Sequence, residues 1–258
     1  MKKCIPTTIS ACFIFPFLSC QNNSSGPALA SYKDAPKDTT LTKAETNLLE
    51  DTTVYAEIHR FPGSVKLDSI AGFDSGTMTK YNVQFPAIQG QHGRFLTKMI
   101  RDTCLYYWDN FRKSIYADGI LLDSANGIFY NEFATGMEMI YVDSSRASVC
   151  LWIHYYANAA AHGYAIFKTI NYDFKNKKFV DFGDRFHMKN ADDSLAFINQ
   201  IETANQAINL NHSLYSYNFF ESSKYFVFCF GHYEASAYMD GMPKAVIRKE
   251  EFVRFLRN

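Results

Sequence analysis

The sequence has 258 residues, with 26 basic and 26 acidic side chains and a formal net charge of zero. A chain of this length can form one large domain or two small ones, and the lack of a basic excess argues against nucleic acid as a partner. Aromatic residues make up 16% of the chain, which favours sheet structure and an aromatic binding face.

The first twenty residues predict the compartment. A short cationic start precedes an apolar stretch over residues 9–18, and Leu18-Ser19-Cys20 resembles the lipobox of bacterial lipoproteins. The apolar stretch is too short to span a bilayer, which takes about 20 residues as a helix. We expect a signal peptide over residues 1–19, lipidation of Cys20, and a lipid-anchored protein of the bacterial cell envelope, at the outer membrane and facing the periplasm. An ordinary signal peptide with an incidental cysteine is the alternative.

Residues 20–50 predict a flexible tether. They are rich in Ser, Asn, Thr, Asp, Lys and Pro and carry few large apolar side chains. Such a segment cannot bury enough apolar surface to fold. We therefore expect folded structure to begin near Asp51.

The first predicted elements are two strands and a long helix. Residues 54–59 alternate between apolar and polar, as do residues 81–85 before Pro86, which we expect to end the second strand. From Phe95 to Ile115, apolar residues recur at steps of three and four. This spacing predicts an amphipathic helix of about 20 residues.

The rest of the chain predicts mostly strands. Short connections at residues 134–136 and 143–146 favour antiparallel neighbours. The predicted strands span residues 128–133, 137–142, 148–156, 164–174, 224–230 and 245–247, with a hairpin tip at residues 176–178. Helices are expected from Asp192 or Asp193 to Ile208 and from Glu250 to Leu256. Runs of strands broken by single helices predict an α+β fold, a mainly antiparallel sheet with packed helices.

Three cysteines, Cys104, Cys150 and Cys229, follow the predicted lipidation site. An odd number allows at most one disulfide. Cys150 and Cys229 lie within apolar, strand-like runs, where a free cysteine behaves as a small buried hydrophobe. Unpaired core thiols are the favoured interpretation, and a Cys150–Cys229 disulfide is the alternative.

Histidines offer little evidence of catalysis. His162 could be a ligand or a base, but a lone histidine more often holds a turn through a ring nitrogen. A metal site built from His154, His162, His232 and Glu234 lacks any His-Glu-x-x-His or Cys-x-x-Cys spacing. We therefore expect no metal, no cofactor and no catalytic residue.

Three carboxylates surround the predicted hairpin at residues 171–186. Asp173, Asp181 and Asp184 could take part in acid–base chemistry. Because asparagine and glycine lie beside them, capping of turns is the simpler interpretation.

The most site-like loop runs from Tyr233 to Met242, directly after a predicted core strand. Tyr233, Glu234, Tyr238 and Gly241 could form a recognition surface, because loops on rigid scaffolds carry binding function and aromatic anchors dominate binding energy. The alternative is that the two tyrosines only cover the edge of the sheet.

Five ordered patches carry a resemblance to a known extracytoplasmic family. They are Tyr155-Tyr156-Ala157-Asn158-Ala159-Ala160-Ala161-His162-Gly163, Ile170-Asn171-Tyr172-Asp173, Phe182-Gly183-Asp184-Arg185-Phe186, Tyr217-Asn218-Phe219 and residues 231–243. Together they resemble the C-terminal domain shared by the anti-sigma factor RsiV and PdaC-type peptidoglycan deacetylases. The resemblance implies an RsiV-like domain over residues 146–258, preceded by a PdaC-like α/β region over residues 51–145. The family usually has Gly-Gly-Ala before the histidine, so the loop before His162 departs from the pattern.

The resemblance implies a binding module and not an enzyme, because neither a deacetylase domain nor a sigma-binding segment accompanies the shared domain. In RsiV this region is the receptor for lysozyme, so a lysozyme-like protein or a peptidoglycan-type glycan is the expected partner. A metal-assisted cell-envelope hydrolase that uses His162, His232 and Glu234 is the alternative, and a purely structural lipoprotein is a third. The expected binding residues are Tyr155, His162, Asp173, Tyr233, Glu234, Tyr238 and Gly241.

Overall fold

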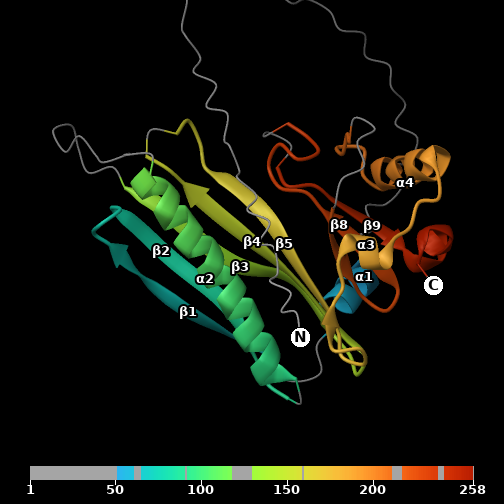
Figure 1. The fold of residues 1–258 in the computed structure, drawn as a ribbon, viewed down its shortest axis with the longest axis horizontal. Coiled ribbons are helices and arrows are strands. Elements are labelled where there is room, and N and C mark those ends of the chain that lie inside the picture. Colours follow the sequence, from blue (N-terminus) through green and yellow to red (C-terminus); the bar gives the residue numbers. More distant parts are fainter. Residues whose placement is uncertain are drawn as a thin grey trace, which may run out of the picture. The chain divides into compact units, whose positions relative to one another are not determined.

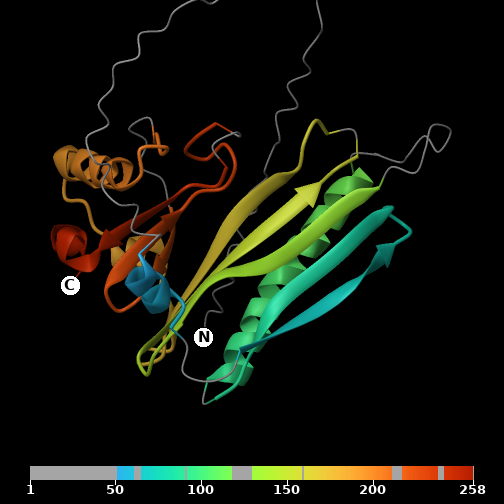
Figure 2. The ribbon, with the colours of Figure 1, turned by 180° about the vertical axis from the view of Figure 1, so that it is seen from behind.

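The computed structural model describes residues 51–60, 65–90, 92–117, 130–158, 160–210, 217–237 and 241–257. These residues form two sheets and several helices, which confirms the predicted α+β fold (Figures 1 and 2). The predicted signal peptide with Cys20, the tether and Tyr238 lie outside the described residues. None of the described helices is both long and apolar enough to cross a lipid bilayer.

The larger sheet contains six strands in the order of the sequence. Its pairings are antiparallel except between β2 and β3, which run parallel because α2 connects them. The strands are β1 (Val65–Asp74), β2 (Thr79–Ile88), β3 (Asn131–Val142), β4 (Arg146–Tyr156), β5 (Tyr164–Asp173) and β6 (Lys178–Phe179).

Helix α2 (Gly93–Ala117) covers one face of this sheet, as Figure 1 shows. Its buried side chains recur at helical spacing, which confirms the amphipathic helix predicted from Phe95 to Ile115. They include Leu96, Ile100, Cys104, Phe111 and Ile115, which pack with buried side chains of β2, β3 and β4.

The smaller sheet lies against the other face of the larger one. Its strands are β7 (Asn218–Glu221), β8 (Tyr225–Cys229) and β9 (Lys244–Arg248). Side chains alternate between the two faces of a strand. One face of the smaller sheet, with Phe220, Val227 and Val246, is buried against β3, β4 and β5. Its other face packs on α3 (Phe182–Arg185), α4 (Ala191–Ala204) and the 3₁₀ helix η4 (Lys249–Phe255).

The strand predicted at residues 54–59 is wrong, because these residues belong to helix α1 (Thr52–Ile58). The Asp51 side chain accepts a hydrogen bond from the Thr53 backbone nitrogen at 2.7 Å and so caps the helix. Val54 and Ile58, four residues apart, are the buried residues of α1. Seven residues are too few for alternation to be distinguished from one helical face.

Strand β3 is continuous through residues 134–136, where the sequence predicted a turn. Gly136 lies against the Trp152 ring, since a Cβ atom there would be 2.4 Å from a ring carbon. The glycine therefore marks a close approach within the sheet and not a turn. Pro86 also fails to end β2, which continues to Ile88. Beyond Val83, β2 pairs only with β1, and a proline is tolerated where one neighbour is missing.

Three short or exposed elements were missed: β1, β7 and α3. Helix α4 was predicted, but its cap is Asn190, whose side chain accepts from the Asp193 nitrogen at 2.8 Å. Both aspartates predicted as caps lie in its first turn, and Ile208 lies beyond its end. The closing helix is present as a 3₁₀ helix.

The domain boundary expected after Ser145 lies in the turn between β3 and β4. These two strands pair along their whole length, from Glu132 with Tyr156 to Val142 with Ala147. Residues on both sides of the expected boundary therefore belong to one continuous sheet.

Candidate functional site

Four of the predicted binding residues lie close together. Tyr155 lies near the end of β4, His162 in the loop to β5, and Tyr233 and Glu234 after β8. The Tyr233 hydroxyl is 2.8 Å from Nε2 of His162. The Tyr164 ring lies 5.3 Å from the Tyr155 ring and is nearly parallel to the Tyr233 ring at 6.5 Å. We call this group the Tyr–His cluster, which consists of Tyr155, His162, Tyr164, His232, Tyr233 and Glu234.

The loop after β8 is held against the edge of β5. A Cβ atom at Gly231 would lie 2.8 Å from the carbonyl oxygen of Ala165 and 2.9 Å from the Cα atom of Ile166, so only glycine fits there. The His232 nitrogen donates to the Ala165 oxygen at 2.9 Å, and the Ala165 nitrogen donates to Nδ1 of His232 at 3.1 Å. Tyr233 has a φ of 64°, a left-handed conformation that costs about 1–3 kcal/mol and that these contacts maintain.

Burial shifts the pKa values of Tyr155, Tyr164, His232 and Glu234 toward the neutral forms of these groups. It raises the pKa of Glu234, although Oε2 of this residue accepts a hydrogen bond from the Gly231 nitrogen at 2.8 Å, which lowers the pKa. Burial also raises the pKa of Tyr155, and nearby Tyr164 and Tyr107 raise it further. For these four groups, burial therefore favours the uncharged form.

Within the described part of the chain, the histidines and their acidic neighbours are not arranged as a metal site. Among the described residues, no three His, Cys, Asp or Glu side chains are arranged so that they could hold a metal ion. The hydrolase alternative, which uses His162, His232 and Glu234, thus lacks a ligand set in this part of the chain. The His162 Nδ1 atom lies 3.1 Å from the Gly163 oxygen, a contact that suits a histidine holding a turn.

Of the other expected binding residues, Asp173 lies at the opposite end of β5 from Tyr164 of the cluster. Asp173 ends β5, where its carboxylate accepts from the backbone and side-chain nitrogens of Asn176 at 2.9 and 2.7 Å. Asp181 and Asp184 form a reciprocal capping box at the start of α3. These contacts match the predicted turn capping. Gly241 has a φ of 77°, and no atom of the described residues would lie within 4 Å of a Cβ atom added to it.

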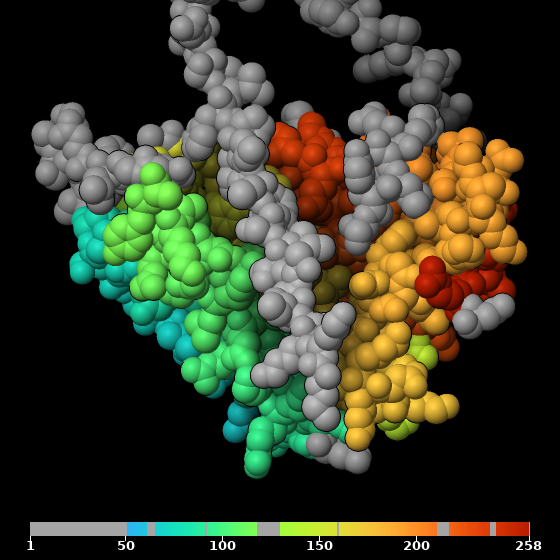
Figure 3. Space-filling model, in the orientation of Figure 1, coloured from blue at the N-terminus to red at the C-terminus, as the bar shows by residue number. Residues whose placement is uncertain are grey.

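Sequence analysis missed a groove of about 830 Å³ between α2 and β5, which we call the α2–β5 groove. Phe95 and Tyr106 from α2 and Phe179 from β6 are 45%, 62% and 57% exposed along it. Tyr107 and Tyr172 complete its aromatic lining. In the space-filling view the green atoms of α2 are exposed on the face shown (Figure 3).

The groove leads toward the Tyr–His cluster. Lys168 and Tyr172 line the groove from β5, and Tyr164 lies on the same face of that strand because side chains two apart share a face. Tyr107 lines the groove and lies close enough to Tyr155 to affect its pKa. Aromatic side chains thus extend from the β6 hairpin to the end of β4.

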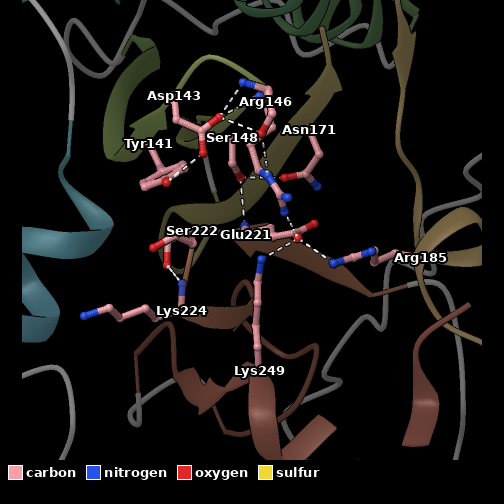
Figure 4. Close-up of polar contacts among 12 residues, drawn as sticks. Tyr141, Asp143, Arg146, Ser148, Asn171, Arg185, Glu221, Ser222, Lys224 and Lys249 are labelled. Carbon is pink, nitrogen blue, oxygen red and sulfur yellow. Dashed lines mark hydrogen bonds and ion pairs between the residues drawn. The ribbon is translucent and has the colours of Figure 1, made fainter. Parts of the chain in front are cut away.

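A buried carboxylate connects four elements, as Figure 4 shows. The Oε1 atom of Glu221 in β7 forms ion pairs with Arg146 of β4, with Arg185 of α3 at 2.8 Å, and with Lys249 of η4 at 2.5 Å. The Glu221 side chain is only 7% exposed. We call these four residues the Glu221 hub.

Positive charge is in excess at the Glu221 hub. Burial lowers the pKa of Lys249 to about 8; Glu221 opposes this shift, while Arg146 and Arg185 contribute to it. Sequence analysis did not identify the hub. An acidic residue directly after Phe219-Phe220 was the available signal, since a buried charge requires partners.

No protein-family model matches the chain, and no curated protein matches it. Solved structures that are similar to it include two DUF3298 family proteins. One is a DUF3298 family protein from Pseudomonas aeruginosa PAO1, with a TM-score of 0.50, 15% identity, and coverage of 76% of this chain and 95% of that chain. The other is a member of the DUF3298 family from Bacteroides fragilis NCTC 9343, with a TM-score of 0.49, 14% identity and the same coverage of both chains. At this identity, the similarity to the Pseudomonas protein concerns the fold alone.

Proposed function

We propose that this chain is a binding module of the bacterial cell envelope that holds a peptidoglycan-type glycan in the α2–β5 groove. The observation that carries the proposal is the row of exposed aromatic side chains along this groove. Two features support a location in the cell envelope, as a lipid-anchored protein facing the periplasm. They are the resemblance to the RsiV-like domain and the lipobox-like segment Leu18-Ser19-Cys20. In this proposal the chain binds its ligand and does not transform it.

The dimensions and chemistry of the groove suit a glycan. Its volume of about 830 Å³ lies within the range of small-ligand sites, about 300–1,000 Å³. Sugar rings have apolar C–H faces that pack on aromatic rings, as Phe179 and Tyr106 would allow. Thr103, whose hydroxyl donates to the Met99 oxygen at 3.0 Å and can still accept, and Tyr107 contribute hydroxyl groups to the lining.

Charge distinguishes between the two expected partners. Lys98, Lys168 and Lys177 line the groove with a single acidic residue, Asp102, which pairs with Lys98 at 2.5 Å. A lysozyme-like protein with a basic surface would meet this positive charge and be disfavoured. The carboxylates of a muramyl glycan would be attracted, so the glycan is the favoured partner.

Calorimetry with soluble peptidoglycan fragments tests the proposal. Phe179→Ala and Tyr106→Ala should each weaken binding about tenfold, equivalent to ~1.4 kcal/mol. Phe73→Ala is the matched control, because Phe73 is 52% exposed on β1 and does not line the groove. Absence of binding by the unaltered protein, or unchanged affinity in both groove variants, would contradict the proposal.

Two further measurements test location and catalysis. Cys20→Ser should release the protein from the membrane fraction, whereas continued membrane association would refute the lipid anchor. Mass spectrometry of the incubated fragments should show no new products. Turnover that is lost in His162→Ala would show that the chain is a hydrolase.

A further inference from the structure

We propose that a pocket beside Glu221 binds an oxyanion, a phosphate, sulfate or carboxylate group, between the guanidinium groups of Arg146 and Arg185. The pocket has a volume of about 300 Å³ and is separate in its lining from the α2–β5 groove except for Tyr172. The inference rests on the charges and contacts of the Glu221 hub and does not depend on the proposed glycan.

The first support is an imbalance of charge. Three cations, Arg146, Arg185 and Lys249, share one oxygen of one carboxylate, Glu221. One acidic group can neutralise only one of these three positive charges. Because the Glu221 side chain is 7% exposed, water screens the remaining positive charge poorly. An anion bound beside the hub would compensate this charge.

The second support is the lining of the pocket as a whole. Four cations, from Arg146, Arg185, Lys175 and Lys178, border it together with three carboxylates. Two of the carboxylates are occupied, since Asp184 pairs with Lys178 at 3.0 Å and Asp173 accepts from Asn176. When Lys249, which also pairs with Glu221, is counted, five cations stand against three carboxylates. The excess is two positive charges.

The third support is that both arginines are held in place before any ligand binds. Asp143 accepts hydrogen bonds from the Ser145 hydroxyl at 2.8 Å and the Arg146 nitrogen at 2.9 Å, which fixes the turn that carries Arg146. Arg185 lies over the Phe226 ring, 5.6 Å from its centroid. Such preorganisation lowers the entropy cost of binding an anion.

The fourth support is a desolvated donor. The Nε atom of Arg185 is buried, and among the described residues it has no hydrogen-bond acceptor. A buried N–H group without an acceptor is rare and costly, so native structures usually compensate for it. Its uncompensated positive potential adds to the attraction of an anion into this pocket.

The pocket suits an acidic group attached to a larger molecule as well as a free ion. The side chains of Ser148 and Asn171 line it and hydrogen-bond to each other at 2.5 Å. The pocket volume of about 300 Å³ leaves room beside an oxyanion for an attached group. The shared chemistry of all these ligands is the oxyanion.

An NMR titration with inorganic phosphate tests the proposal, with chloride at equal ionic strength as the reference. Backbone signals of Arg146, Arg185 and Glu221 should shift saturably with phosphate and not with chloride. N-acetylglucosamine 6-phosphate provides a second arm. Tighter binding of the sugar phosphate would assign the site to an acidic substituent of a glycan, and equal binding would assign it to the free anion. A failure to saturate with either compound would overturn the proposal.

Variants sharpen the test in both directions. Arg185→Gln should weaken phosphate binding at least tenfold, and Lys175→Gln, on the exposed rim, about twofold to threefold. Glu221→Gln should tighten phosphate binding about fivefold, because the anion no longer competes with the Glu221 carboxylate for the two arginines. Arg112→Gln is the control, since Arg112 pairs with Asp109 on α2 away from the pocket. If Arg185→Gln fails to fold, the other two variants test the site, because Lys175→Gln should weaken phosphate binding and Glu221→Gln should tighten it. Unchanged phosphate affinity in both variants would contradict the site.

Discussion

The sulfur atoms of Cys150 in β4 and Cys229 in β8 lie 3.7 Å apart in the core between the two sheets. Both are free thiols and fully buried, as the favoured interpretation of the sequence expected. Their contact brings the alternative, a disulfide, within reach of a small side-chain movement.

We predict that refolding with oxidised glutathione links Cys150 to Cys229. Two thiols would lose two protons and two electrons to the glutathione disulfide, which is reduced to two thiols. Because the bond would close a long loop, the free energy of unfolding should rise by about 3–4 kcal/mol. Mass spectrometry should detect the loss of two hydrogen atoms, and Cys104→Ser should leave that loss unchanged. Full recovery of free thiols after refolding would contradict the prediction.

The Glu221 hub predicts unequal effects of removing its members. Glu221→Ala leaves three partly buried cations without their shared partner and should lower the free energy of unfolding by about 3–5 kcal/mol. Lys249→Met removes one excess cation and keeps contact with the Phe226 ring, so it should cost less than about 1 kcal/mol. Urea denaturation measures both variants. Equal losses would show that the pair of Lys249 with Glu221 carries the stabilisation and that Lys249 is not an excess cation.

Glu234 predicts a dependence of stability on pH. Its folded pKa is raised by burial above the ordinary value of 4.5. At pH values between the unfolded pKa and the raised folded pKa of Glu234, the folded protein therefore binds more protons than the unfolded chain. The free energy of unfolding should fall as pH rises through this range. Glu234→Gln should remove this contribution, whereas Glu250→Gln, at an exposed residue, should retain it. Unfolding curves at a series of pH values above 4 provide the measurement.

We predict that the Tyr–His cluster depends on the close contact between Gly231 and β5. Gly231→Ala places a methyl group 2.8 Å from the Ala165 oxygen, so the loop must move away from β5. We expect a loss of about 1–3 kcal/mol in stability and loss of the contact between His162 and Tyr233. Gly183→Ala is the control, because its nearest neighbour would be at 3.5 Å. Unfolding curves and NMR of the His162 ring distinguish the two variants, and identical behaviour would show that Gly231 does not support the cluster.

Local patterns were sufficient to predict α2, β4, β5 and the α+β class. The residues from Phe95 to Ile115 repeat every three to four positions, and that period alone predicts which face of the helix is buried. Short segments were less well determined. Val54 and Ile58 fit one face of α1 as well as they fit a strand, and the glycine at position 136 suggested a turn where the chain makes a close contact with Trp152.

The candidate sites depended on the tertiary structure to different degrees. The sequence alone predicted Tyr155, His162, Tyr233 and Glu234 as binding residues. Tyr155 and His162 lie in a patch that carries the family resemblance, and Tyr233 and Glu234 lie in a loop after a predicted strand. The sequence contained no sign of the α2–β5 groove or of the pairing between Arg146 and Glu221, which are 75 positions apart. Such contacts arise only when the two sheets and their helices pack, because hydrophobic periodicity specifies which face of an element is buried but not which element covers it.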